Sequence, residues 1–193
     1  MLINRKKIAL YGGSFDPPHM GHQAIIRHLL YCKKFDQVRL ILVFKHPFNK
    51  DLASFEHRFA MCELLCSPFG DSAVTDAIER ELVTSGRSEG HTVDTLRTLV
   101  NCETPDEYTL VIGADIVHEL GDWKDFEGIK TLAKVLILSR PGYTPVDGYT
   151  YAAVDPPKIS SSELRKHIAA GDPVARFIYP PVLDYIRKTK LYM

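Results

Sequence analysis

The sequence predicts an α/β fold in which a doubly wound parallel sheet carries helices on both faces. Short apolar runs rich in β-branched residues alternate with amphipathic segments along the 193 residues. The run at 38–44, Val-Arg-Leu-Ile-Leu-Val-Phe, is nearly continuously apolar, as expected of a strand that is buried on both faces. Because strands that alternate with helices pair in parallel, the pattern favours one sheet wrapped by helices.

The first part of the chain shows this alternation clearly. An apolar Ile-Ala-Leu run marks a strand at 7–11, and the amphipathic stretch 21–35 follows it as a helix. After the strand at 38–44, a broad apolar stripe of phenylalanine, methionine, leucine and cysteine predicts a helix at 54–66. The short run at 74–78 is expected to be the next strand.

The remaining elements continue the pattern to the end of the chain. We expect strands at 108–112, 134–139 and 149–154, and helices at 92–102, 116–120, 126–132, 161–170 and 180–191. Gly171 stands where one of these helices should end, and Pro180 lies in the first turn of the last. No repeat, low-complexity tract or linker interrupts the series, so a single domain spanning 1–193 is expected.

Composition and charge narrow the classes of partner. Twenty-four basic and 24 acidic residues give a net charge of zero, so the chain lacks the basic excess typical of nucleic-acid-binding proteins. No apolar run approaches the roughly 20 residues of a membrane-spanning helix. A cytoplasmic location is therefore expected, and the four cysteines are interpreted as reduced thiols that pack in the core. The sequence is also compatible with assembly into a homo-oligomer.

The most informative stretch is 11–22, Tyr-Gly-Gly-Ser-Phe-Asp-Pro-Pro-His-Met-Gly-His, between the first strand and the first helix. Glycines allow a sharp turn and a close approach of backbone to ligand. His19 and His22 stand where the helix begins, and a helix start offers unpaired N–H groups to an anion. The stretch predicts a phosphate site. A role of the histidines as helix caps alone is given less weight, because glycines and prolines surround them.

A second stretch, Lys-Ile-Ser-Ser-Ser-Glu-Leu-Arg at 158–165, has two interpretations. Ser160 and Glu163 fit a capping box, in which case Arg165 is simply solvated. Three hydroxyls and an arginine at a helix start also form an anion cradle. Lys50 could add a further cation, and a solvated loop lysine is an equally good interpretation.

Four polar or glycine-bearing segments follow predicted strands. In an open α/β sheet, ligands lie outside the carboxyl ends of the strands. These segments should therefore gather at one edge of the sheet, and they are 12–22, 46–50, 113–115 and 140–142.

Together these motifs resemble the His-x-Gly-His nucleotidyltransferase superfamily and, within it, the bacterial nicotinate-nucleotide adenylyltransferases. The loop Gly-Ser-Phe-Asp-Pro-Pro-His-x-Gly-His and the later Ile-Ser-Ser-Ser-x-x-Arg carry the superfamily resemblance. The segment 90–96, Gly-His-Thr-Val-Asp-Thr-Leu, is similar to the family's pyridine-recognition segment. Gly-Ala-Asp at 113–115, Trp123, and the segments 138–142 and 179–186 match in the family's order.

The resemblance implies a Rossmann-like fold and adenylyl transfer from ATP to nicotinate mononucleotide. The products would be deamido-NAD and pyrophosphate, in NAD biosynthesis. The mononucleotide phosphate would attack directly, without a covalent enzyme intermediate, and Mg²⁺ would be carried on the ATP phosphates rather than by a protein metal site. Catalysis of this kind depends on positioning and on charge stabilisation.

The resemblance also assigns roles to residues. Catalysis would involve His19, His22, Lys50 and Arg165. ATP would contact Gly12, Gly13, Ser14, Phe15, Gly21, Ser161 and Ser162. The mononucleotide would lie against His91, Thr92, Thr95, Gly113, Asp115, Trp123 and Arg140. The chain departs from the family pattern at His91, where a tyrosine is usual, and at Ser162, where threonine is common.

Two alternatives stay open. A related adenylyltransferase could use nicotinamide mononucleotide or phosphopantetheine as acceptor, although His19 and Trp123 argue against phosphopantetheine. A non-catalytic nucleotide sensor is the alternative from another class. A sensor has no need for cations around a leaving pyrophosphate, so the set of His19, His22, Lys50 and Arg165 argues for an enzyme.

Overall fold

The computed structural model describes residues 5–45, 52–101, 106–139, 145 and 148–193. Within them, six parallel strands form one sheet in the order β3-β2-β1-β4-β5-β6. The strands are β1 (Lys7–Gly13), β2 (Gln37–Leu42), β3 (Ala73–Asp76), β4 (Glu107–Gly113), β5 (Lys134–Ser139) and β6 (Thr150–Ala153). The predicted doubly wound, Rossmann-like α/β fold is confirmed.

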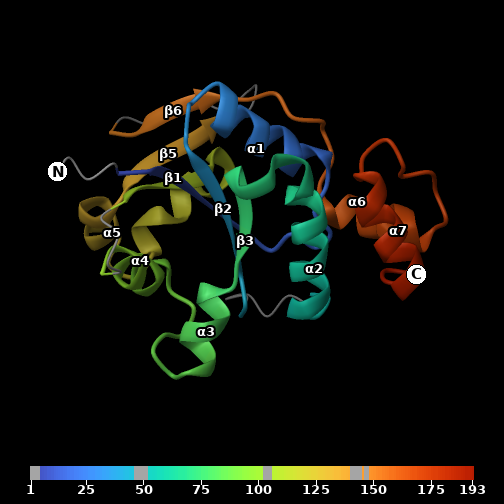
Figure 1. Ribbon diagram of the computed structural model, residues 1–193, viewed down its shortest axis with the longest axis horizontal. Helices are drawn as coiled ribbons and strands as arrows, with labels where there is room; N and C mark the ends of the chain where they lie inside the picture. The colour runs from blue at the N-terminus through green and yellow to red at the C-terminus, as the bar shows by residue number, and fades with distance from the viewer. Residues whose placement is uncertain (1–4, 46–51, 102–105, 140–144, 146–147) are drawn as a thin grey trace.

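Helices cover both faces of the sheet (Figure 1). They are α1 (Met20–Tyr31), α2 (Phe55–Cys66), α3 (Ile78–Thr84), α4 (Thr92–Val100), α5 (Phe126–Leu132), α6 (Ser161–Ala169) and α7 (Pro180–Thr189). The 3₁₀ segments η1 (Ser67–Ser72) and η2 (Ala114–Asp122) follow α2 and β4. Figure 1 shows α1 and α2 on one side of the sheet and α4 and α5 on the other.

Each face of the sheet has its own core because side chains alternate along a strand. In β1, Ala9 and Tyr11 pack with α1, α2, α6 and α7, whereas Ile8 and Leu10 pack with α3, α4 and α5. Cys62 and Cys66 lie buried in the first core as free thiols, as predicted, and burial raises the pKa of Cys66 to about 11. Cys32 is also a free thiol but is exposed, so the prediction of core packing is wrong for it, and Cys102 lies outside the described residues.

The region after β3 differs from the prediction. The strand expected at 74–78 ends at Asp76, and Ile78 instead begins α3. A carboxylate oxygen of Asp76 accepts a hydrogen bond from the N–H of Ile78 at 2.9 Å, which turns the chain into the helix. Ile78 then packs in the second core, so its apolar side chain is buried without being part of the sheet.

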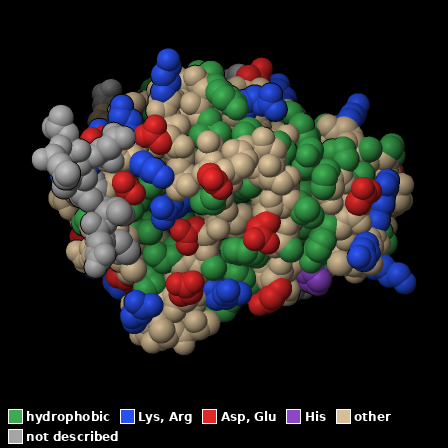
Figure 2. Space-filling model, in the orientation of Figure 1, with side chains coloured by type: hydrophobic (Ala, Val, Ile, Leu, Met, Phe, Trp, Pro, Cys, Tyr) green, Lys and Arg blue, Asp and Glu red, His purple; other side chains and the backbone are tan. Residues whose placement is uncertain are grey.

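The sheet has its switch point between β1 and β4, since the chain moves outward from β1 through β2 on one side and from β4 through β5 on the other. In doubly wound sheets this is the place where ligands bind, at the carboxyl ends of the strands. On the face seen in Figure 2, acidic and basic side chains are interspersed. No helix in the described part of the chain is long and apolar enough to cross a membrane.

Candidate active site

The loop that follows β1 is shaped by Phe15. Its backbone is left-handed, with φ of 49°, and its ring is buried edge-on against Tyr11 with 5.5 Å between centroids. A Cβ at Gly13 would lie 3.0 Å from the Phe15 ring, so the ring leaves room for little more than glycine there. A Cβ at Gly12 would meet nothing within 4 Å. At the carboxyl end of β1, the Phe15 ring therefore packs against Gly13, whereas the space beside Gly12 is open.

His19 and His22 begin α1 as a pair. Nδ1 of His19 accepts a hydrogen bond from the N–H of Gly21, and Nδ1 of His22 accepts one from the N–H of His19, each at 3.1 Å. The two rings lie against each other at an interplanar angle of 31°, with centroids 3.8 Å apart. Two imidazoles thus form a capping box. The histidines therefore do cap the helix, a role that the sequence pattern did not favour.

This capping fixes the tautomer of both rings. A neutral imidazole whose Nδ1 accepts a hydrogen bond carries its proton on Nε2. Each ring can therefore serve as an N–H donor at Nε2 while its Nδ1 holds the helix start. The same arrangement requires glycine at position 21, because a Cβ there would lie 2.9 Å from the His19 ring.

The second phosphate element reaches the first. The Ser161 hydroxyl donates to the carbonyl of Pro17 at 2.9 Å, and Nη1 of Arg165 donates to the carbonyl of Asp16 at 2.6 Å. Ser160 and Glu163 form the predicted capping box. Both interpretations of this segment are therefore partly right. Ser160 caps the helix, and Arg165 is bound to the loop rather than solvated. Nη2 of Arg165 also lies 3.4 Å from the Ser162 hydroxyl.

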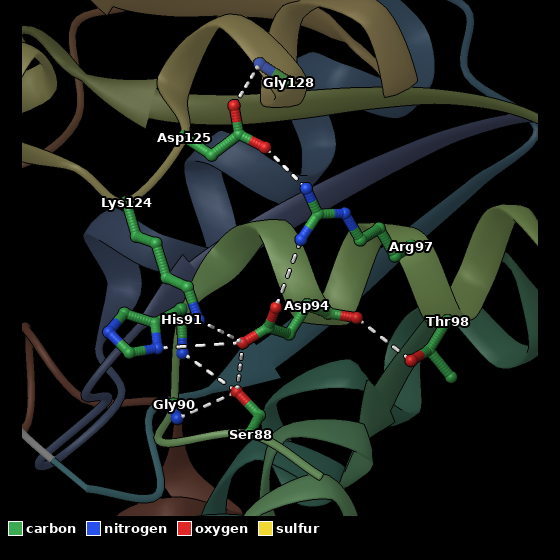
Figure 3. Close-up of polar contacts among 9 residues, drawn as sticks. All are labelled: Ser88, Gly90, His91, Asp94, Arg97, Thr98, Lys124, Asp125 and Gly128. Carbon is green, nitrogen blue, oxygen red and sulfur yellow. Dashed lines mark hydrogen bonds and ion pairs between the residues drawn. The ribbon is translucent and has the colours of Figure 1, made fainter.

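A network of polar side chains organises the start of α4 (Figure 3). The Ser88 hydroxyl accepts from the N–H groups of Gly90 and His91, at 3.1 and 3.2 Å, and donates to Asp94 at 2.9 Å. Burial alone would raise the pKa of Asp94, but the Ser88 hydrogen bond and the Lys124 ammonium outweigh burial and lower it. Lys124 lies 3.4 Å from Asp94, which ties α4 to the segment after Trp123.

The other predicted acceptor residues lie at the end of β4, in and directly after η2, and on α4. Gly113 ends β4, and a Cβ there would collide with a carboxylate oxygen of Asp115. Trp123 is half-buried, with its ring edge-on to Phe126 at 6.5 Å between centroids. Thr95 is buried in α4 and Thr92 begins that helix.

Lys50 and Arg140 lie outside the described residues, as do the rest of 46–51 and 140–144. In the part of the chain that the structure describes, no group of three or more His, Cys, Asp or Glu side chains could hold a metal ion.

The chain is similar to known nucleotidyltransferases. The cytidylyltransferase-like family matches residues 10–167. A protein of Myxococcus xanthus named probable nicotinate-nucleotide adenylyltransferase is 36% identical over 188 residues, covering 96% of this chain and 94% of that protein. A protein of the same name from Anaeromyxobacter sp. (strain K) is 37% identical and covers 97% of both chains. This chain belongs to the nicotinate-nucleotide adenylyltransferase family. The resemblance inferred from the motifs is confirmed.

Solved structures agree with the fold of this adenylyltransferase-family chain. A Plasmodium falciparum nicotinic acid mononucleotide adenylyltransferase, complexed with NaAD, superposes with a TM-score of 0.78 at 22% identity. The match covers 97% of this chain and 98% of that one. At this identity the likeness extends to the fold.

Arg58 is a buried charge in the adenylyltransferase site that the motifs did not indicate. Its side chain is 2% exposed, and its guanidinium donates to the carbonyls of Ser14, Val43 and Ala53 at 2.8 to 3.0 Å. Burial lowers its pKa, opposed by the charge of Asp16. The guanidinium holds the loop after β1 to the end of β2. The sequence does carry a signal for this buried charge, because Arg58 interrupts the apolar stripe of α2 at helical spacing from Phe55.

Glu79 of α3 was also missed. It is 8% exposed, and Oε1 accepts a hydrogen bond from the N–H of Phe44 at 2.7 Å. Burial raises the pKa of Glu79 to about 7. Oε1 would also lie 3.5 Å from a Cβ at Gly90, so the carboxyl sits between the end of β2 and the loop before α4.

Proposed function

We propose that the protein transfers the adenylyl group of ATP to nicotinate mononucleotide, releasing pyrophosphate and forming deamido-NAD in NAD biosynthesis. Family membership supports the reaction. The observation that carries it in the structure is the meeting of the histidine pair at α1 with Ser161 and Arg165 of α6 on one loop. A triphosphate needs several donors at once, and these elements place them together.

The reaction needs positioning and charge stabilisation rather than a protein nucleophile. A phosphate oxygen of the mononucleotide forms a bond to the α-phosphorus of ATP, and the bond from that phosphorus to the pyrophosphate oxygen breaks. Negative charge spreads over the transferring group during this step. Nε2–H donors of His19 and His22 are suited to stabilise that charge, because the capping bonds have already fixed the rings.

The leaving pyrophosphate is assigned to the start of α6. Ser161, Ser162 and Arg165 would bind its oxygens, and Lys50 would bridge toward the acceptor phosphate. Gly12, Gly13, Ser14, Phe15 and Gly21 would bring backbone close to the nucleotides. Mg²⁺ would arrive with ATP, since a hard cation prefers phosphate and water oxygens, and the nearby Asp16 carboxylate is engaged by Tyr192 and Arg165.

The acceptor is assigned to the other side of the switch point. N–H groups at the start of α4, around His91 and Thr92, would bind the nicotinate carboxylate, as helix starts bind anions. Thr95 would support that helix turn. The Trp123 ring would stack on the cationic pyridinium, while Gly113, Asp115 and Arg140 would lie near the ribose or phosphate. A cytoplasmic location remains an expectation.

The test is a comparison of acceptors with the purified protein, ATP and Mg²⁺. Pyrophosphate release is measured with nicotinate mononucleotide, nicotinamide mononucleotide and phosphopantetheine. The highest kcat/KM is expected with nicotinate mononucleotide. A preference for either other acceptor would overturn the substrate assignment, and ATP binding without turnover on any acceptor would favour a nucleotide sensor.

A further inference from the structure

We propose that Tyr192, the penultimate residue, is a positioning residue for the ATP phosphate site, acting through Asp16. This inference rests on the proposed use of Arg165 and Ser161 in binding ATP. The Tyr192 hydroxyl donates to Oδ1 of Asp16 at 2.5 Å, across 176 residues of sequence. The C-terminal tail thereby reaches the loop that carries the first phosphate motif.

Asp16 depends on such donors because it is a buried charge. Its side chain is 1% exposed, and an ionised carboxylate removed from water must be compensated by hydrogen bonds and opposite charge. Besides Tyr192, Oδ1 accepts from the N–H of Ala53 at 3.3 Å. Oδ2 has Arg165 as its ion-pair partner, 3.4 Å from Nη1. Of the two hydrogen bonds that described residues donate to Oδ1, Tyr192 thus supplies the shorter.

The position of Asp16 determines where Arg165 lies. Nη1 of Arg165 contacts both the carbonyl and the carboxylate of Asp16. The next residue, Pro17, accepts the hydrogen bond from Ser161. A shift of Asp16 would therefore move two of the proposed pyrophosphate-binding side chains, Ser161 and Arg165, relative to His19, three residues further along the chain.

The backbone of the C-terminal residues places this hydroxyl at the loop. Helix α7 packs in the first core through Val182, Leu183 and Ile186, and it ends at Thr189. Lys190 and Tyr192 then adopt left-handed backbone, with φ of 54° and 64°, which folds the last residues back. Burial and the Asp16 charge raise the pKa of Tyr192 far above its ordinary value, so the hydroxyl stays a donor at every working pH.

Tyr192→Phe tests the proposal, with Tyr185→Phe as the matched control. Tyr185 lies on α7 with its hydroxyl 2.9 Å from Nδ1 of His57, so each substitution removes one hydroxyl that has a side-chain partner. Tyr192→Phe should raise the KM for ATP by about tenfold, the effect of losing one hydrogen bond to a charged group. The KM for nicotinate mononucleotide should change far less, and Tyr185→Phe should leave both constants near their original values.

Binding of ATP, measured by calorimetry without acceptor, separates this proposal from the proposed reaction. A wild-type protein that binds ATP but does not turn over would refute the reaction alone. Weaker ATP binding by Tyr192→Phe, relative to Tyr185→Phe, would still support Tyr192 as a positioning residue. Equal ATP affinity in the two variants, or equal rises in both Michaelis constants for Tyr192→Phe, would overturn it.

Discussion

The backbone N–H of His19 donates to Nδ1 of His22 at 3.1 Å, so the second histidine of the motif is oriented by the first. Helix capping and phosphate chemistry are therefore not competing roles for these residues. The cap uses Nδ1, and it sets Nε2–H as the donor that each neutral ring presents. The rigid placement of such donors before substrate binds is what makes electrostatic stabilisation effective.

Substitution of His22 separates the two roles. His22→Ala should lower kcat by at least ~10²-fold, the usual cost of removing a donor to a developing charge. His22→Gln should lose similar activity while keeping a thermal midpoint closer to wild type, because glutamine also completes a capping box. Steady-state kinetics and thermal unfolding measure the two effects. Near-normal kcat in either variant would remove His22 from its proposed role.

Trp123 is predicted to affect the acceptor alone. Trp123→Ala should raise the KM for nicotinate mononucleotide by about fivefold, since stacking of a cation on an aromatic face contributes on the order of 1 kcal/mol. The KM for ATP should stay within about twofold. Trp123→Phe retains an aromatic face and should lose less. If both Michaelis constants rise together in the alanine variant, the tryptophan is structural, and its contact with Phe126 would be the reason.

The buried acid Glu79 should make stability depend on pH. Its folded pKa of about 7 exceeds the usual value of 4.5, so the folded state holds its proton longer than the unfolded state does. Stability contributed by the protonated form is present below pH 4.5 and is lost as pH rises to about 7. The loss is on the order of 3 kcal/mol.

Glu79→Gln removes this titration while keeping an acceptor for the N–H of Phe44. Denaturant unfolding of both proteins between pH 4 and about 8 gives the comparison. The variant should gain stability relative to wild type as pH rises through that window. A stability difference that is constant with pH would show that Glu79 does not titrate as described.

Local patterns predicted most of the sheet and the phosphate loop. The apolar strand at 7–11 and the glycine and histidine residues after it are signals carried by neighbours in sequence. Helix α3 was missed, because Ile78 continues an apolar run and only the Asp76 carboxylate and the second core turn it into helix. Short apolar runs do not distinguish a strand from a buried helix start.

The support of the loop was not predictable in the same way. Arg58 bonds to carbonyls from three separate segments, and Tyr192 reaches Asp16 from the far end of the chain. Such contacts exist only after the sheet has brought distant residues together. Local motifs in the sequence therefore predict candidate residues for the chemistry, whereas the residues that hold the loop in place are seen only in the fold.

Transfer of label from ATP tests the central claim most directly. The protein is incubated with nicotinate mononucleotide, Mg²⁺ and ATP that is labelled at the α-phosphorus. The label should appear in deamido-NAD, with one unlabelled pyrophosphate released for each dinucleotide formed. Label that stays in ATP, or that is released as AMP without a dinucleotide, would contradict adenylyl transfer to the mononucleotide.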